Sequence, residues 1–198
     1  MSISITLHRS GTSRTQQVDT TTTGLDLFGS DRAVVAMRVD GNLVDLQREL
    51  HDGAEVEPVE ATSEDGLNII RHSATHVMAQ AVQQLYPEVN LGIGPFITDG
   101  FYYDFGNIEP VTPEVLSELE KRMKRIVKEN QRFVRRVTTE ESAREELADQ
   151  PYKLELIGTK GKGAEGASVE VGGGELTIYD NVRRNGEVAW KDLCRGPH

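Results

Sequence analysis

Two short segments of this chain hold most of the side chains that could do chemistry. His72 and His76 lie four residues apart in a run with helical periodicity, a spacing that places two imidazoles on one helical face, one turn apart. Cys194, the only cysteine, and His198 have the same spacing, but the Gly-Pro dipeptide between them favours a bend over a helix. Each pair alone is weak evidence, because such spacings occur by chance. Together they predict a metal site or a catalytic pocket.

A helix must bring the two histidines to one side, and the sequence predicts it over residues 67–85. Ser63 is a suitable N-cap, and the acidic residues that follow it suit the positive end of the helix dipole. Pro87 ends the helix. The face expected to be buried consists of Ile69, Ile70, Val77, Ala81 and Leu85.

The next segment is predicted to be a β-hairpin, with strands over residues 89–97 and 101–105 and a turn at Asp99 and Gly100. Tyr102 and Tyr103 are neighbours in the second strand, so their side chains face opposite sides. One can therefore pack in the core while the other points into a pocket.

A second long helix is predicted from Pro113 to about residue 130, because Thr112 is a good N-cap and proline is favoured at the first helical position. Its apolar stripe consists of Leu116, Leu119, Met123, Ile126 and Val127. A strand over residues 133–137 follows. A capping box at residues 138–141 then begins a short helix that runs to about residue 149.

The last predicted elements are two strands, over residues 175–182 and 187–194, joined by a hairpin turn at Asn185 and Gly186. This hairpin directs Asp192 and Cys194, two residues apart in one strand, to the same side of the sheet.

Two stretches between these elements have no predicted regular structure. No element is assigned to residues 151–157. Residues 158–174 hold seven glycines and little that could pack, so we expect a flexible surface loop. It is not a phosphate-binding loop, because the Gly-Lys-Ser/Thr ending is missing.

Residues 1–61 are predicted to form a small α+β unit of short strands. Apolar and polar residues alternate over residues 3–7, as in a half-buried strand, and residues 34–39 predict another. A short helix over residues 25–28 lies between them. No catalytic constellation occurs here, which favours an accessory module.

The charge balance is acidic, with 22 Lys+Arg against 32 Asp+Glu, so a nucleic acid could bind only at a local basic patch. Residues 121–136 supply one, with eight basic residues and one acid: Lys121, Arg122, Lys124, Arg125, Lys128, Arg132, Arg135 and Arg136 against Glu129. This stretch is either a solvated helix face or a surface that contacts phosphates. A single cysteine and no apolar run of about 20 residues favour a cytoplasmic protein without a membrane span.

Four segments together resemble, in the same order, the N-terminal part of a bacterial threonyl-tRNA synthetase. They are Arg-His-Ser-Ala-Thr-His at 71–76, Gly-Pro at 94–95 with Gly-Phe-Tyr-Tyr-Asp at 100–104, Tyr152 with Lys153, and Asp-Leu-Cys-Arg-Gly-Pro-His at 192–198. The resemblance implies an α+β fold in two domains. Residues 1–61 would be a β-grasp (ubiquitin-like) TGS domain. Residues 62–198 would be most of the editing (second additional) domain, truncated at its C-terminus, with an antiparallel sheet packed against long helices.

The same resemblance implies proofreading, the hydrolysis of mischarged Ser-tRNA(Thr). Serine lacks one methyl group of threonine, and a contact of that size supplies only about 1–3 kcal/mol of discrimination. The parent enzyme would bind tRNA(Thr), use ATP and zinc, and dimerise through a synthetic core that this chain lacks. The editing reaction itself would need no cofactor.

Site roles follow the family motif. Lys153 and His72 would orient or activate the water, since a histidine titrates near neutral pH and burial can lower the pKa of a lysine. Asp192 would hold the substrate ammonium. The remaining pocket residues, which would bind the ribose and the seryl hydroxyl, are His76, Cys194, His198 and Tyr103. Replacement of His72 or Lys153 by alanine is expected to abolish deacylation and leave the fold intact.

Two other interpretations stay open. His72, His76, Cys194 and His198 are a sound zinc set, as in a zinc-dependent deacylase of the alanyl type. Alternatively, the chain is a non-catalytic module that docks tRNA, and the histidines are core residues. Cys194 as a covalent nucleophile is less favoured, since nothing requires an acyl-enzyme.

Overall fold

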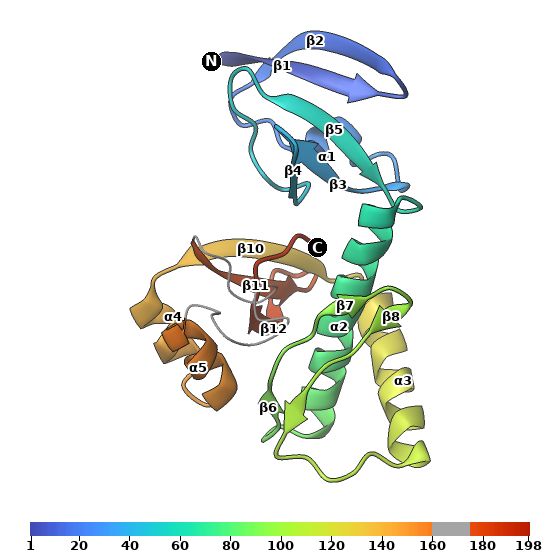
Figure 1. The fold of residues 1–198 in the computed structure, drawn as a ribbon, viewed down its shortest axis with the longest axis vertical. Coiled ribbons are helices and arrows are strands. Elements are labelled where there is room, and N and C mark those ends of the chain that lie inside the picture. The colour runs from blue at the N-terminus through green and yellow to red at the C-terminus, as the bar shows by residue number, and fades with distance from the viewer. Residues whose placement is uncertain (160–174) are drawn as a thin grey trace. The chain divides into compact units, whose positions relative to one another are not determined.

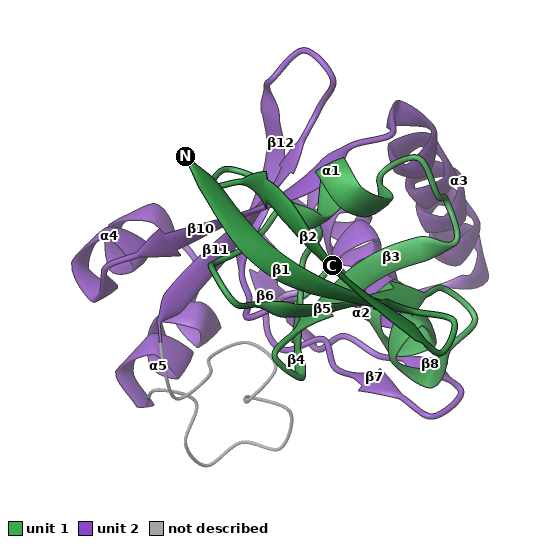
Figure 2. Cartoon of the chain, turned by 90° about the horizontal axis from the view of Figure 1, so that it is seen from above, with its two compact units in different colours: residues 1–70, 197–198 green, residues 71–196 purple. Residues whose placement is uncertain are grey.

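The computed structural model describes residues 1–159 and 175–198 of the chain. Two compact units make up this part, residues 1–70 with 197–198 (unit 1) and residues 71–196 (unit 2), coloured separately in Figure 2. The glycine-rich loop predicted over residues 158–174 lies outside the described residues, except for its first two residues, which end helix α5 (Pro151–Thr159). The predicted α+β class is confirmed.

Unit 1 is a five-stranded sheet with one short helix (Figure 1). The strand order is β2-β1-β5-β3-β4; β1 and β5 are parallel and the other neighbours antiparallel. The elements are β1 (Ser2–Arg9), β2 (Thr12–Asp19), α1 (Gly24–Phe28), β3 (Val34–Val39), β4 (Asn42–Val44) and β5 (Glu55–Glu60).

The core of unit 1 follows from the alternation seen in the sequence. Ile3 and Ile5 of β1 are buried together with Phe28 of α1 and Val56 of β5. No residue range was predicted for strand β2, because its residues are mostly polar on both faces and it joins the sheet as an edge strand through backbone pairing with β1.

Helix α2 (Glu64–Leu85) confirms the predicted histidine helix, and its residues from 71 onward belong to unit 2. The prediction of the buried face is wrong for Ile70, which is 43% exposed, whereas Ile69 is buried as predicted. Adjacent helical residues differ by 100° in direction, so the contact that buries Ile69 leaves Ile70 at the edge.

Helix α3 (Pro113–Glu129) begins as predicted, with the Thr112 hydroxyl accepting a hydrogen bond from the Val115 N–H at 3.4 Å. Its buried residues, Leu119 and Ile126, pack against α2. Leu116 and Val127 lie past the edge of this contact and are exposed, contrary to the prediction.

An antiparallel sheet of order β10-β11-β12 forms the other half of unit 2 (Figure 1). Its strands are β10 (Arg132–Thr138), β11 (Leu176–Val182) and β12 (Val188–Leu193), close to the predicted ranges. Two short helices, α4 (Glu140–Glu146) and α5, pack against Ile178 and Leu193 on one face. Helix α4 is capped by Thr139, one residue later than predicted, and α5 was not predicted.

The predicted hairpin after α2 is interrupted. Instead of two continuous strands, there are two short antiparallel pairs: β6 (Asn90–Leu91) with β9 (Phe105–Gly106), and β7 (Phe96–Ile97) with β8 (Gly100–Phe101). Between them Gly94 lies against the Tyr103 ring, where an added Cβ would be 2.3 Å from Cδ2. This close approach, and the missing N–H of Pro95, break the ladder.

No helix among the described residues is long and apolar enough to cross a membrane.

Helix α3 offers a matched test of this packing. Leu119→Ala is expected to lower the free energy of unfolding by about 2–5 kcal/mol, because it leaves a cavity between α3 and α2. Leu116→Ala removes the same atoms from a residue that is 58% exposed and is expected to change stability by less than about 0.5 kcal/mol. Chemical denaturation of both variants measures the difference. Equal losses would contradict the packing described.

Candidate functional site

The β-sheet of unit 2 presents two rows of side chains on the face opposite α4 and α5. Tyr179 pairs with Asp192 in one row, and Asn181 pairs with Trp190 in the next. Because side chains alternate along a strand, both rows point to the side that does not carry Ile178 and Leu193.

Helix α2 lies against these rows and is fixed there by side-chain hydrogen bonds. Asn181 Nδ2 donates to Gln80 Oε1 at 2.8 Å, and Trp190 Nε1 donates to Gln83 Oε1 at 2.7 Å. His76 is one helical turn before Gln80, so the bonds that hold the glutamines also hold the histidine against the sheet.

The centre of the site is a buried charge pair. Lys153 of α5 and Asp192 of β12 are both fully buried, and Lys153 Nζ lies 3.1 Å from Asp192 Oδ2. The Tyr103 hydroxyl donates to the same oxygen at 2.8 Å, and the Leu193 N–H donates to Oδ1 at 2.8 Å. Burial raises the pKa of Asp192, while Lys153 and these hydrogen bonds oppose the rise.

His72 and Cys194 form a second contact in the site. Cys194 Sγ lies 3.3 Å from His72 Nε2 and accepts a hydrogen bond from the Gly196 N–H at 3.2 Å. Gly196 has φ +72°, and a Cβ there would be 1.8 Å from the Tyr179 hydroxyl, so only glycine fits. The predicted bend after Cys194 is thus present at Gly196.

His76 is enclosed by aromatic rings. The rings of His72, Trp190 and Phe133 all meet it edge-on, with centroids 5.4, 5.3 and 6.0 Å away. Burial, then the charges of His72 and Lys153, hold the pKa of His76 well below its usual 6.5. His76 is therefore a neutral imidazole at neutral pH.

Six of the seven predicted site residues lie in unit 2 and meet there: His72, His76, Tyr103, Lys153, Asp192 and Cys194. The seventh, His198, is assigned to unit 1, where its N–H donates to Asp45 Oδ1 at 2.9 Å. Tyr103 is buried and Tyr102 is 42% exposed, so the predicted division of the two tyrosines is confirmed.

Several residues of the site were not found from the sequence. Gln80, Gln83, Asn181 and Trp190 position α2 on the sheet. The only signal for the glutamines was their spacing from His76 along one helical face, and nothing marked Asn181 and Trp190, because only the strand register brings them opposite that face.

The donor atoms of His72, His76 and Cys194 could hold a metal ion. They lie within 4.8 Å of one another, and two imidazoles with one thiolate are donors that zinc accepts. The neutral state of His76 suits a ligand as well. Three of the four predicted ligands of the alternative zinc site therefore lie together in unit 2, and the fourth, His198, belongs to unit 1.

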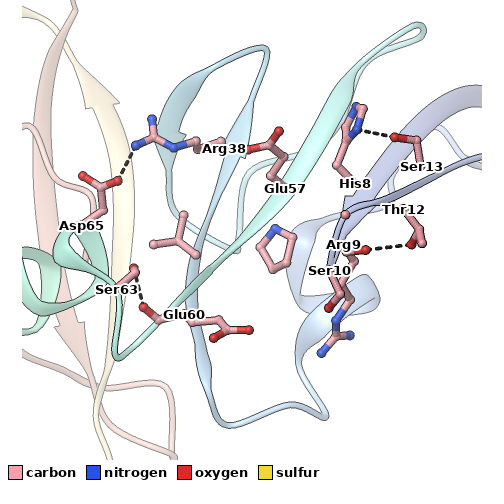
Figure 3. A pocket seen from close by; sticks show the side chains of 13 residues that line it. His8, Arg9, Ser10, Thr12, Ser13, Arg38, Glu57, Glu60, Ser63 and Asp65 are labelled. Atoms are coloured by element: carbon pink, nitrogen blue, oxygen red, sulfur yellow. Dashed lines mark hydrogen bonds and ion pairs between the residues drawn. The ribbon is translucent and has the colours of Figure 1, made fainter.

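Unit 1 carries an open cavity of about 590 Å³, drawn in Figure 3. The end of the β1–β2 hairpin, β5 and the start of α2 line it. Among the residues that line it, Arg38 forms an ion pair with Asp65, and His8 Nδ1 lies 2.8 Å from Ser13 Oγ. None of the predicted catalytic residues lines this cavity.

The predicted basic patch divides into two groups of residues. Four of its cations form ion pairs: Arg122 with Glu118, Lys124 with Glu120, Arg135 with Glu175, and Arg136 with Glu146 and Asp180. The other four are exposed and form no ion pair among the described residues: Lys121, Arg125, Lys128 and Arg132. Three of these follow the i, i+4, i+7 spacing of one face of α3.

Comparisons with known proteins point to one enzyme. The chain is 59% identical over 199 residues to a threonine--tRNA ligase of Streptomyces avermitilis, covering 99% of this chain and 30% of that protein. It is 62% identical to that of Streptomyces griseus over 91% of the chain and 28% of the relative. It is 59% identical to the threonine--tRNA ligase of Thermobifida fusca, over 90% of this chain and 28% of that protein. No protein-family model matches the chain. The chain thus spans about 30% of the length of its relatives, and the resemblance predicted from its residues is confirmed.

The burial of Lys153 revises the expectation that its removal leaves the fold intact. Lys153→Met is expected to lower the free energy of unfolding by about 3–5 kcal/mol, because it leaves the Asp192 carboxylate buried without its counter-charge. In the double variant Lys153→Met with Asp192→Leu, the free energy of unfolding should fall by less than the sum of its decreases in the two single variants. Denaturant titration of the three variants measures this coupling.

Lys191→Met is the matched control, since Lys191 is 39% exposed where it pairs with Glu146. A surface pair of this kind contributes about 0–1 kcal/mol. If the Lys153 variant were no less stable than this control, the pair would not hold the site together.

Proposed function

Since this chain is related to the bacterial threonine--tRNA ligases over nearly its whole length, we propose that unit 2 is their proofreading site and hydrolyses Ser-tRNA(Thr). The observation that carries the proposal is the buried Lys153–Asp192 pair beside the His72–Cys194 contact. A protein does not bury charges and imidazoles together for packing alone, because each costs desolvation energy.

The reaction is an ester hydrolysis in which a water molecule attacks the carbonyl carbon of the seryl ester. The water proton passes to a base, and the ribose oxygen leaves and takes up a proton. We assign His72 the role of base, because an imidazole can accept a proton near neutral pH. Lys153, as the ammonium partner of Asp192, would orient the water and stabilise the developing oxyanion.

Asp192 is assigned to the substrate ammonium, which serine and threonine share. Its Oδ2 already accepts from Tyr103 and Lys153, so the ammonium would join this network rather than meet a free carboxylate. Tyr103, His76 and Cys194 would shape the pocket for the ribose and the seryl hydroxyl. A pocket role for His198, which belongs to unit 1, is what the family resemblance alone implies.

We predict that the chain hydrolyses Ser-tRNA(Thr) faster than Thr-tRNA(Thr), with no effect of a chelator. His72→Gln is expected to lower the rate by roughly 10²- to 10⁴-fold, because it removes the base and keeps a polar side chain of similar reach. Single-turnover release of labelled serine and threonine from the two tRNAs measures the rates.

His51→Gln is the control for this experiment, because His51 is an exposed histidine of unit 1 that pairs with Asp40. Circular dichroism checks that both variants are folded. Full activity in His72→Gln would remove His72 from the role of base. Loss of activity with a chelator, together with stoichiometric zinc, would instead make His72, His76 and Cys194 metal ligands, the second function that their geometry supports.

The exposed cations of α3 support a second part of the proposal, that this face contacts tRNA phosphates. The chain as a whole is acidic, with a formal net charge of −10, so the attraction must be local. Lys121, Arg125 and Lys128 lie on one face of α3 and are exposed, which leaves their charges available to phosphates.

The triple variant Lys121→Gln, Arg125→Gln, Lys128→Gln should weaken tRNA binding and reduce its salt dependence. Each lost phosphate contact lowers the slope of log affinity against log salt by about 0.9, so a reduction of about 3 is expected. Filter binding over a range of salt concentrations measures the slope.

The control is a second triple variant, Arg14→Gln, Arg48→Gln, Arg184→Gln, which makes the same change in net charge at exposed residues elsewhere in the chain. Equal effects of the two triples would mean that only net charge matters.

We further propose that unit 1 is a β-grasp domain of the TGS type. The strand order β2-β1-β5-β3-β4, with β1 and β5 parallel at the centre, supports this assignment. For the longer protein that the relatives represent, aminoacylation with ATP, a zinc ion in the synthetic core, tRNA(Thr) as substrate and a homodimer are what the resemblance implies.

A further inference from the structure

An exposed aromatic side chain lies beside the buried polar cluster of unit 2. Phe96, in β7, is 39% exposed, and its ring centroid is 6.4 Å from that of His72, with the planes tilted by 54°. A single exposed phenylalanine needs no explanation by itself. Contact with a buried histidine that we assign to catalysis does distinguish this one.

Phe96 lies at one end of a short wall along the site. Gly94 lies against the ring of Tyr103, and the hydroxyl of Tyr103 donates a hydrogen bond to Asp192. Two residues after Gly94, the ring of Phe96 contacts the ring of His72. Pairing of Phe96 with Phe101 holds it in the β7–β8 hairpin. The wall therefore runs from the charge pair, where the amino acid would lie, to an aromatic ring that water can reach.

We propose that Phe96 is the residue on which the terminal base of the substrate stacks. This inference rests on the proposed function. In an aminoacyl-tRNA the ester is carried by the ribose of a terminal adenosine, so a base is attached directly to the sugar that enters the site. With the ester held near His72 and Asp192, Phe96 offers an exposed aromatic ring that is in contact with His72.

The chemistry of a nucleobase fits this ring. A purine has a large π face and binds aromatic side chains by stacking, which requires an exposed ring face and no hydrogen-bond partner. Phe96 adds binding that is the same in the ground state and in the transition state. Its loss should therefore raise KM and leave kcat nearly unchanged.

The test measures the coupling between the ring and the base without any hydrolysis. Two stable ligands are used, 3′-serylamino-3′-deoxyadenosine and the same seryl sugar without its base, and calorimetry gives their Kd values. The chain should prefer the ligand with the base by roughly 5- to 150-fold, the range found for stacking of one base. Phe96→Ala and Phe96→Leu should abolish this preference, and Phe96→Trp should keep it.

Ile97→Ala is the matched control, because Ile97 is the next residue of the same strand, is 48% exposed and points to the other side of the hairpin. It should keep the preference for the base. A preference that survives in Phe96→Ala, or a chain that binds neither ligand, overturns the inference.

The two proposals can fail separately. If the base preference depends on Phe96 but Ser-tRNA(Thr) is not hydrolysed, the hydrolytic function is wrong and the stacking site stands. If hydrolysis is selective for serine and Phe96→Ala changes neither KM nor the base preference, the function stands and the stacking site is wrong.

Discussion

The site depends on one constraint, that the Lys153 ammonium and the Asp192 carboxylate are both withdrawn from water. Each charge alone would be very costly to bury, and the pair is tolerated only with good geometry and further hydrogen bonds. Tyr103 and the Leu193 N–H supply those bonds. The hairpin that carries Tyr103, the helix that carries Lys153 and the strand that carries Asp192 are thus held in one arrangement by a single carboxylate.

Polar contacts also hold the side of α2 that lies against the sheet, although other buried residues of this helix are apolar. A helix packed on a sheet usually presents an apolar stripe. Here Gln80 and Gln83 occupy that stripe and bond to Asn181 and Trp190 across the interface. Because these hydrogen bonds are directional, they fix both the position of the helix along its axis and its rotation about that axis. Apolar contacts restrict these two movements less strictly. The orientation of His76 against Trp190 is a consequence.

The sequence predicted the parts of the site that rest on local rules. Helical spacing gave His72 and His76, and strand alternation separated Tyr102 from Tyr103. It did not predict α5, whose residues lack a clear period, although that helix places Lys153. Nor did it predict the break in the hairpin, which arises because Gly94 contacts the Tyr103 ring nine residues away. Local pattern found the chemical groups, and tertiary contacts decided their partners.

The charges of the site also bear on the choice between water and zinc. A zinc ion bound by two neutral imidazoles and one thiolate carries one net positive charge. It would lie close to the Lys153 ammonium, whose charge, after burial and the charge of His72, contributes to the lowered pKa of the neighbouring His76. In a buried site of low dielectric, two cations near one carboxylate repel each other strongly. A site without zinc avoids that repulsion and leaves the His72 imidazole free of a metal bond, so the charge balance supports the metal-free reaction that we propose.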